Sequence, residues 1–166
     1  MRHAARMIPA LAFAAGVLFA QASPPALPGN VELEANIAYD THKATVLDVM
    51  RPKDSSGAKR PAVIVIHGGG WVGGTKEGMV ANYCLPYLEK GFVVANVEYR
   101  LAADAKAPAA VQDVLKAADW FLKNAEKYGV DRKRVVVTGG SAGGHLALMV
   151  AMTPKSAKLG PHSKVA

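Results

Sequence analysis

The fold is decided by VVVTGGSAGGHLALMV, residues 135–150. The β-forming residues before the glycines favour a buried strand, and the apolar residues after them favour a helix. One serine, Ser141, stands at the corner between the two, inside the pattern G-x-S-x-G that Gly139 and Gly143 complete. In that context the corner strains the serine backbone and projects its hydroxyl above the sheet. The stretch therefore predicts a nucleophilic serine.

Small residues around this serine support the same hypothesis. Gly139 and Gly143 avoid a collision where the strand and the helix approach each other. The backbone N–H of Ala142 opens the helix and points to the place where negative charge would develop. The alternative is an ordinary glycine-rich turn that binds phosphate at a helix N-terminus. A serine placed between strand and helix favours the nucleophile.

A second glycine cluster, HGGGW at residues 67–71, ends an earlier apolar run that begins at Pro61. Backbone N–H groups stabilise the oxyanion of acyl transfer when no side chain crowds the approach, so Gly69 and Gly70 are predicted to contribute such groups. His67 is expected to brace the loop by hydrogen bonding and not to act as a base. A flexible turn is the alternative. Two glycine loops, each after a predicted parallel strand, favour a shared site.

Strands and helices alternate outward from these motifs. This order predicts a three-layer α/β/α sandwich with a mostly parallel sheet. The apolar stripe of the longest helix recurs at steps of three and four, and Gly129 is expected to end that helix. The predicted strands are 31–39, 44–52, the apolar part of 61–71 before its glycines, 92–97 and 134–138. The predicted helices are 77–90, 111–128 and 142–152.

The N-terminus has the pattern of a secretory signal peptide. Arg2 and Arg6 precede an apolar run, residues 8–20, and a small-residue A-x-A site ends at Ala22. An uncleaved anchor is the alternative, but the run is shorter than the about 20 residues that span a bilayer. The sequence thus predicts a signal peptide at 1–22, a linker at 23–30, one domain at 31–166, and a secreted or periplasmic protein.

Charge and cysteine content exclude other classes. The net charge is +7, yet residues 23–141 carry 15 basic and 13 acidic side chains. The basic residues there are scattered, with only Arg132-Lys133-Arg134 adjacent, so no nucleic-acid partner is expected. Cys84 is the only cysteine, which excludes a disulfide framework. It is expected to be a buried structural thiol. No later stretch is long and apolar enough to span a membrane, and the oligomeric state stays open.

Three separated blocks resemble the α/β-hydrolase esterases: HGGGW, GGSAGG, and VEYRLAADAKAPAAVQDVLKAADW at 97–120 between them. The likeness runs from about residue 39 to 152. It is strongest to the hormone-sensitive-lipase-like group and to secreted esterases of feruloyl or acetyl type. The resemblance implies a serine carboxylic-ester hydrolase that acts on small or carbohydrate-linked esters and needs no metal or organic cofactor.

Residue roles follow from the same likeness. It makes Ser141 the nucleophile and the N–H groups of Gly69, Gly70 and Ala142 the oxyanion hole. Trp71 would line the acyl or alcohol pocket, although a core tryptophan is the alternative. The likeness also makes Arg100 and Asp113 structural partners, with a plain surface pair as the alternative.

The acid and the histidine of such a triad should follow the serine in the chain. After Ser141 the sequence has no Asp or Glu, and its two histidines are His145 and His162. His145 lies on the helix that carries the serine and is expected to pack there, and His162 has no acid partner downstream. We therefore expect the chain to be the N-terminal part of a longer hydrolase and to be inactive alone. For the function, the alternatives to an esterase are an amidase or peptidase of this fold and a non-catalytic binding module.

Overall fold

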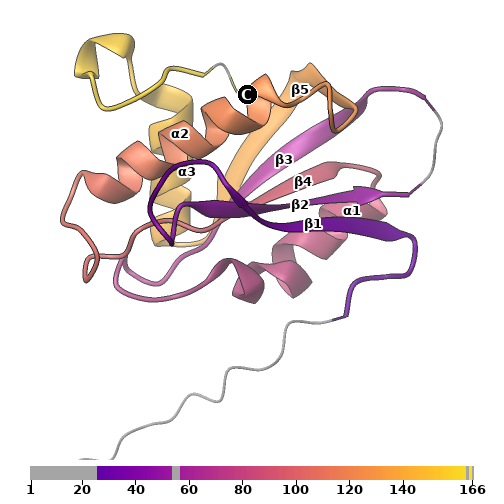
Figure 1. The fold of residues 1–166 in the computed structure, drawn as a ribbon, viewed down its shortest axis with the longest axis horizontal. Helices are drawn as coiled ribbons and strands as arrows, with labels where there is room; N and C mark the ends of the chain where they lie inside the picture. The colour runs from indigo at the N-terminus through magenta and orange to yellow at the C-terminus, as the bar shows by residue number, and fades with distance from the viewer. Residues whose placement is uncertain (1–25, 54–56, 164, 166) are drawn as a thin grey trace, which may run out of the picture.

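A mixed β-sheet forms the centre of the molecule (Figure 1). The structure is a computed structural model that describes residues 26–53, 57–163 and 165. Strand β2 is antiparallel to β1 and β4, and β3 is parallel to β4 and β5, so β2 alone runs against the others. The sheet order is β1-β2-β4-β3-β5, with β1 at Val31–Ala38, β2 at Val46–Pro52, β3 at Arg60–Ile66, β4 at Val93–Val97 and β5 at Val130–Gly139.

Helices cover both faces of this sheet, which confirms the predicted sandwich (Figure 1). Helices α2 (Ala109–Lys123) and α3 (Ala142–Met152) lie on one face, and α1 (Leu85–Glu89) lies on the other. Alternate residues of β3 supply both cores. Ile64 and Ile66 pack in the cluster with α2 and α3, whereas Val63 and Val65 pack in the cluster with α1.

The single helix predicted at 77–90 is wrong. The segment forms a 3₁₀ turn at Lys76–Met79, a π turn at Val80–Cys84 and only then α1. Pro86 explains the break, because it has no N–H to donate to the carbonyl four residues earlier. Cys84 lies in this segment and is fully buried, as expected, and burial raises the pKa of its thiol to about 12.

Helix α2 also ends earlier than predicted. Its last residue is Lys123, where the Asn124 side chain donates a hydrogen bond to the Trp120 carbonyl over 2.8 Å. Tyr128 of the predicted stripe is still buried, but it lies in the turns that follow. Gly129, with a φ of +67°, makes the turn into β5 and does not end the helix.

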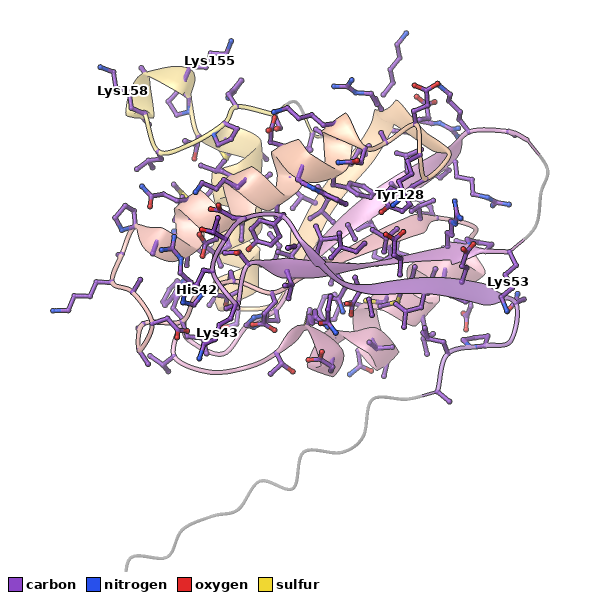
Figure 2. The ribbon with its side chains drawn as sticks, viewed as in Figure 1. His42, Lys43, Lys53, Tyr128, Lys155 and Lys158 are labelled. Atoms are coloured by element: carbon purple, nitrogen blue, oxygen red, sulfur yellow. The ribbon has the colours of Figure 1, made fainter. Side chains whose placement is uncertain are left out.

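The predicted signal peptide lies outside the described residues. Within the described ranges, no helix is long and apolar enough to cross a membrane. Exposed lysines are dispersed over the surface: Lys53 lies at one end of the sheet, and Lys155 and Lys158 lie on the C-terminal turn (Figure 2).

Candidate active site

Ser141 occupies a strained corner between β5 and α3. Its φ and ψ are 54° and −119°, and its side chain is exposed. A non-glycine residue with positive φ is uncommon, and such strain persists mainly at functional sites. The structure therefore presents a serine hydroxyl to solvent at the carboxyl end of a parallel strand.

The corner is pressed against the end of β3. An ideal Cβ at Gly139 would lie 2.4 Å from the Ile66 carbonyl oxygen, and one at Gly143 would lie 2.1 Å from the same oxygen. Gly139 also pairs with Ile66 in the sheet. Only glycine allows the turn and the strand to come this close.

The HGGGW loop meets the serine corner at Gly68. An ideal Cβ on Gly68 would be 3.4 Å from the Cβ of Ser141 and 2.6 Å from the Gly140 carbonyl oxygen. The structure thus brings together the two segments that the sequence analysis singled out.

Several backbone amides lie near this contact. In the described part of the chain, neither the Gly69 N–H nor the Gly70 N–H donates a hydrogen bond, whereas the Gly69 carbonyl accepts from Val72 and Gly73. Ala142 is the first residue of α3, where helix amides lack an intrahelical partner. These amides are available to an anionic ligand.

His67 is buried beneath the loop, with 1% of its surface exposed. Its Nδ1 lies 2.8 Å from the Gly68 carbonyl oxygen and its Nε2 lies 2.8 Å from Oε1 of Glu98. The ring stacks on Tyr99 with centroids 4.2 Å apart. Both ring nitrogens face oxygen atoms, so the two hydrogen bonds need two hydrogens. Either each nitrogen carries one, or Nδ1 carries one and the Glu98 carboxyl donates the other to Nε2. Gly68 and Glu98 thus occupy both nitrogens of this ring.

The two histidines that follow β5, His145 and His162, have no acid partner among the residues that the structure describes. His145 is exposed one turn after Ser141, and Nδ1 of His162 lies 3.0 Å from the Thr153 carbonyl oxygen. Among the described residues, no carboxylate hydrogen-bonds to either imidazole, and no cluster of His, Cys, Asp and Glu could hold a metal ion. His145 was expected to pack on its helix, but it is exposed, and its ring meets that of Trp71 edge to face with the ring centroids 5.5 Å apart.

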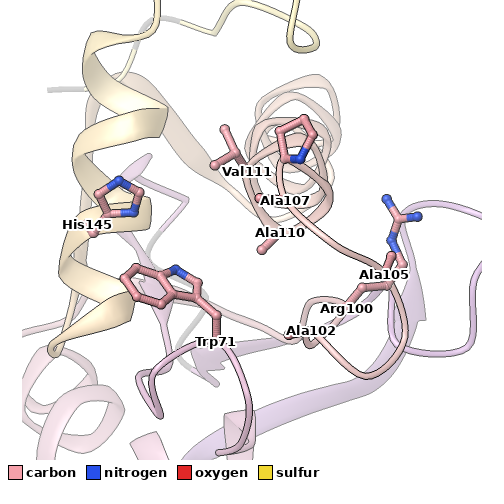
Figure 3. Close-up of a pocket in the computed structure, with 9 residues that line it drawn as sticks. Trp71, Arg100, Ala102, Ala105, Ala107, Ala110, Val111 and His145 are labelled. Atoms are coloured by element: carbon pink, nitrogen blue, oxygen red, sulfur yellow. The ribbon is translucent and has the colours of Figure 1, made fainter.

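A cavity of about 280 Å³ opens beside these motifs (Figure 3). Trp71 and His145 form one wall, and the segment after β4 forms the other. Trp71 is 41% exposed, so it is not a core tryptophan. Its carbonyl accepts a 2.7 Å hydrogen bond from the Ala102 amide, which ties the two walls together. The remaining lining residues are Arg100, Ala105, Ala107, Pro108, Ala110 and Val111.

Arg100 is paired at the edge of this cavity. Its Nε and Nη2 donate to the Asp113 carboxylate over 2.8 and 2.6 Å, and Asp113 is fully buried. Hydrogen bonding by Asp113 raises the pKa of the Arg100 guanidinium. The two residues are structural partners, as the resemblance implied, and not a plain surface pair.

Two neighbours of the site escaped the sequence analysis. Glu98 follows β4 directly, and since β3 and β4 are parallel their carboxyl ends meet, which is a signal that could have paired Glu98 with His67. The Tyr83 hydroxyl lies 2.7 Å from an ideal Cβ on Gly140. No signal marked Tyr83, because the π turn that carries it was expected to be regular helix.

Comparison with known proteins gives the family. Residues 47–165 match the BD-FAE family. The chain is 34% identical over 119 residues to esterase LipC of Mycobacterium tuberculosis, covering 70% of this chain and 29% of LipC. It is 37% identical over 137 residues to arylacetamide deacetylase of Oryctolagus cuniculus, covering 79% and 33%. The chain therefore spans about a third of the length of these curated relatives.

Solved structures of esterases also resemble this chain. The chain superposes with a TM-score of 0.71 and 31% identity on esterase B from Lactobacillus rhamnosis inhibited by a tributyrin phosphonate, covering 85% of this chain and 47% of that one. It superposes with a TM-score of 0.63 and 30% identity on Thermogutta terrifontis esterase 2 phosphorylated by paraoxon, covering 79% and 50%. Family match, sequence relatives and structural neighbours lead to one conclusion: the chain belongs to the BD-FAE family of α/β-hydrolase esterases.

Proposed function

We propose that this chain carries the nucleophile and the oxyanion hole of a serine carboxylic-ester hydrolase that acts on small or carbohydrate-linked esters. The observation that carries the proposal is the contact between Gly68 and Ser141. It sets an exposed, strained serine beside a loop whose Gly69 and Gly70 amides donate to none of the described residues. Acyl transfer needs both parts within one small space.

The reaction follows from these groups. Ser141 Oγ attacks the ester carbonyl carbon, and the carbonyl electron pair moves to oxygen. The amides of Gly69, Gly70 and Ala142 stabilise the resulting oxyanion. The adduct collapses, the alcohol leaves with a proton, and the acyl group stays on Ser141 until water releases it as the acid.

A general base must accept the Ser141 proton, and we propose that it is absent from this chain, together with its acid. His67 is engaged by Gly68 and Glu98 and serves to brace the oxyanion loop. We expect this chain alone to be nearly inactive, because oxyanion and binding effects without the triad retain only roughly 10³–10⁴ over the uncatalysed rate.

Amide hydrolysis is the second candidate. One relative is named an arylacetamide deacetylase, and the same serine and amide groups serve an amide carbonyl equally well. A non-catalytic module is less well supported, because both the serine and the glycine loop are intact.

Phosphonylation tests the nucleophile and the oxyanion hole of the proposed function: Ser141 Oγ bonds to phosphorus, fluoride leaves, and buffer or hydroxide takes the serine proton in place of the absent base. The chain is incubated with a fluorophosphonate, and peptide mass spectrometry follows the adduct on Ser141 and on Ser156. Ser156 is an internal control, since it is exposed in the short turn Lys155–Ala157. We expect Ser141 to react at least about 100-fold faster than Ser156, the size of the effect of one oxyanion-hole donor.

The Ser141→Ala variant should lose the fast adduct and keep the slow one. Equal rates at the two serines in the unmodified chain would overturn the proposal.

We also propose that residues 1–22 direct the protein out of the cytoplasm as a cleaved signal, giving a secreted or periplasmic esterase. N-terminal sequencing of the protein recovered from an expressing bacterium should begin at Ser23. Recovery of chains that still start at Met1, in the cytoplasmic fraction alone, would contradict this.

A further inference from the structure

The cavity in Figure 3 lies between residues that follow both glycine motifs. Trp71 comes directly after Gly70, and His145 lies one helical turn after Ser141. A group bonded to a carbonyl at Ser141 would therefore extend toward this cavity. At about 280 Å³ the cavity suits a small ligand group.

Its lining carries no free charge. Arg100 is held by two hydrogen bonds to the buried Asp113, so its charge is compensated in place. The wall opposite Trp71 is made of alanines, Pro108 and Val111. Such a surface favours an uncharged ligand, because a carboxylate or phosphate would lose its hydration without gaining a free cation.

His145 differs from the rest of the lining. Its ring meets Trp71 edge to face, and in the described ranges its two ring nitrogens make no hydrogen bond. The Trp71 indole can only donate, whereas a neutral imidazole has both a donor and an acceptor nitrogen. Among the side chains of the cavity, His145 is thus the hydrogen-bond acceptor that is not already paired.

We propose that His145 is a specificity-determining residue of this pocket. Its ring nitrogen accepts a hydrogen bond from a hydroxyl on the uncharged group that fills the cavity, and Trp71 provides a flat apolar wall for that group. The inference rests on the proposed function in one respect: the group that fills the cavity is taken to be part of the ester. The binding itself needs no catalysis.

The test uses a matched pair of ketones that no esterase can cleave: 4-(hydroxymethyl)acetophenone and 4-ethylacetophenone. The two have the same shape and differ by a hydroxyl in place of a methyl. The chain has two tryptophans, so the indole N–H signals of Trp71 and Trp120 can both be followed by NMR during each titration. Trp120 is half-buried against the core and serves as the control within the same sample.

We expect both ketones to move the Trp71 signal and leave Trp120 unmoved. The hydroxyl compound should bind roughly five- to tenfold more tightly, the value of one hydrogen bond. In His145→Phe, which keeps a ring against Trp71, this ratio should fall to about one while the ethyl compound binds as before. In His145→Gln, which keeps an acceptor, part of the preference should return.

An unchanged ratio in His145→Phe, or no movement of the Trp71 signal with either ketone, would overturn the inference. His145 is exposed, so its substitution should leave the fold intact. An unchanged Trp120 signal in each ligand-free variant verifies this. Fast phosphonylation of Ser141 without these shifts would leave the proposed function standing and remove the inference alone. Shifts of the Trp71 signal without fast phosphonylation would leave the binding inference standing and remove the proposed function.

Discussion

The HGGGW loop and the serine turn are both rich in glycine, but they need it for different reasons. In the loop, Gly69 and Gly70 have φ of +113° and +60°, values that residues with a side chain rarely adopt. In the turn, Gly139 and Gly143 have ordinary φ, and it is Ser141 that has a positive one. The turn keeps its glycines because the backbone of β3 leaves no room for a Cβ.

This difference assigns a separate task to each segment. Positive φ values set the path of the loop, and a Cβ on Gly69 would meet only the loop's own Gly73 carbonyl oxygen, so the loop glycines act on the conformation of the loop itself. Close approach anchors the corner to the sheet, so the turn glycines act through space. Substitutions can separate the two, because a spatial conflict with strand backbone should cost more than a strained dihedral angle in a loop.

The largest effect is expected for Gly143→Ala. Its Cβ would lie 2.1 Å from the Ile66 carbonyl oxygen and 2.6 Å from that of His67. Both carbonyls belong to backbone at the end of β3, so we expect the free energy of unfolding to fall by about 3 kcal/mol or more. Urea denaturation followed by circular dichroism measures this loss.

Gly78→Ala is the matched control, since its φ is ordinary and no atom lies within 4 Å of its ideal Cβ. It should change the free energy of unfolding by less than about 0.5 kcal/mol. Equal midpoints for the two variants would break the argument from close approach.

Gly69→Ala should come next. It combines the φ of +113° with a Cβ 2.1 Å from the Gly73 carbonyl oxygen, but that oxygen belongs to a loop that can shift. We expect a loss of about 2 kcal/mol and a much slower phosphonylation of Ser141, because the shifted loop misplaces its amides.

The control within the same loop is Gly73→Ala, which has open space around its Cβ and an ordinary φ. It should keep most of the labelling rate. If Gly69→Ala labelled as fast as the unmodified chain, the loop would have no part in the site.

Gly140→Ala should have a moderate effect of about 1 kcal/mol, because overpacking against a side chain is relieved more easily than against backbone. The nearest atom to its Cβ is the Tyr83 hydroxyl oxygen, at 2.7 Å. Tyr83→Phe removes that atom, so the double variant should be more stable than the two single losses predict. Strictly additive losses in a double-mutant cycle would show that Tyr83 is not what crowds Gly140.

The smallest effect, and a stabilising one, is expected for Ser141→Gly. The φ and ψ of Ser141 are those of the first central position of a type II′ turn, which glycine prefers. Relief of strain should exceed the entropy cost of glycine and raise the free energy of unfolding by about 0.5–1 kcal/mol. Ser141→Ala should leave it unchanged. Thermal melts compare the two, and a lower melting temperature for the glycine variant would show that the corner is unstrained.

Sequence patterns predicted much of this molecule, because period and punctuation mark regular elements. The apolar runs located β3, β4 and β5, and the glycine stops located the two site segments. The break at Lys76–Met79 and Val80–Cys84 escaped, since the effect of Pro86 falls on residues before it. The serine and the loop were expected to share a site, and their contact at Gly68 agrees with that expectation.

Partners across the sheet were harder to predict. Glu98 beneath His67 and Asp113 beside Arg100 depend on which strands and helices become neighbours, which one sequence does not state. Only the likeness to known esterases suggested the second pair. The orientation of His145 toward Trp71 depends on how α3 leaves the serine corner, and it differs from the packing role that its place on the helix predicted.

NMR of the chain phosphonylated at Ser141 tests the shared site most directly. A phosphoryl oxygen on Ser141 should accept hydrogen bonds from the amides of Gly69, Gly70 and Ala142, so we predict that these three amide protons move downfield together. Movement confined to the residues around Ser141, with the Gly69 and Gly70 signals unchanged, would contradict a site built from both glycine segments.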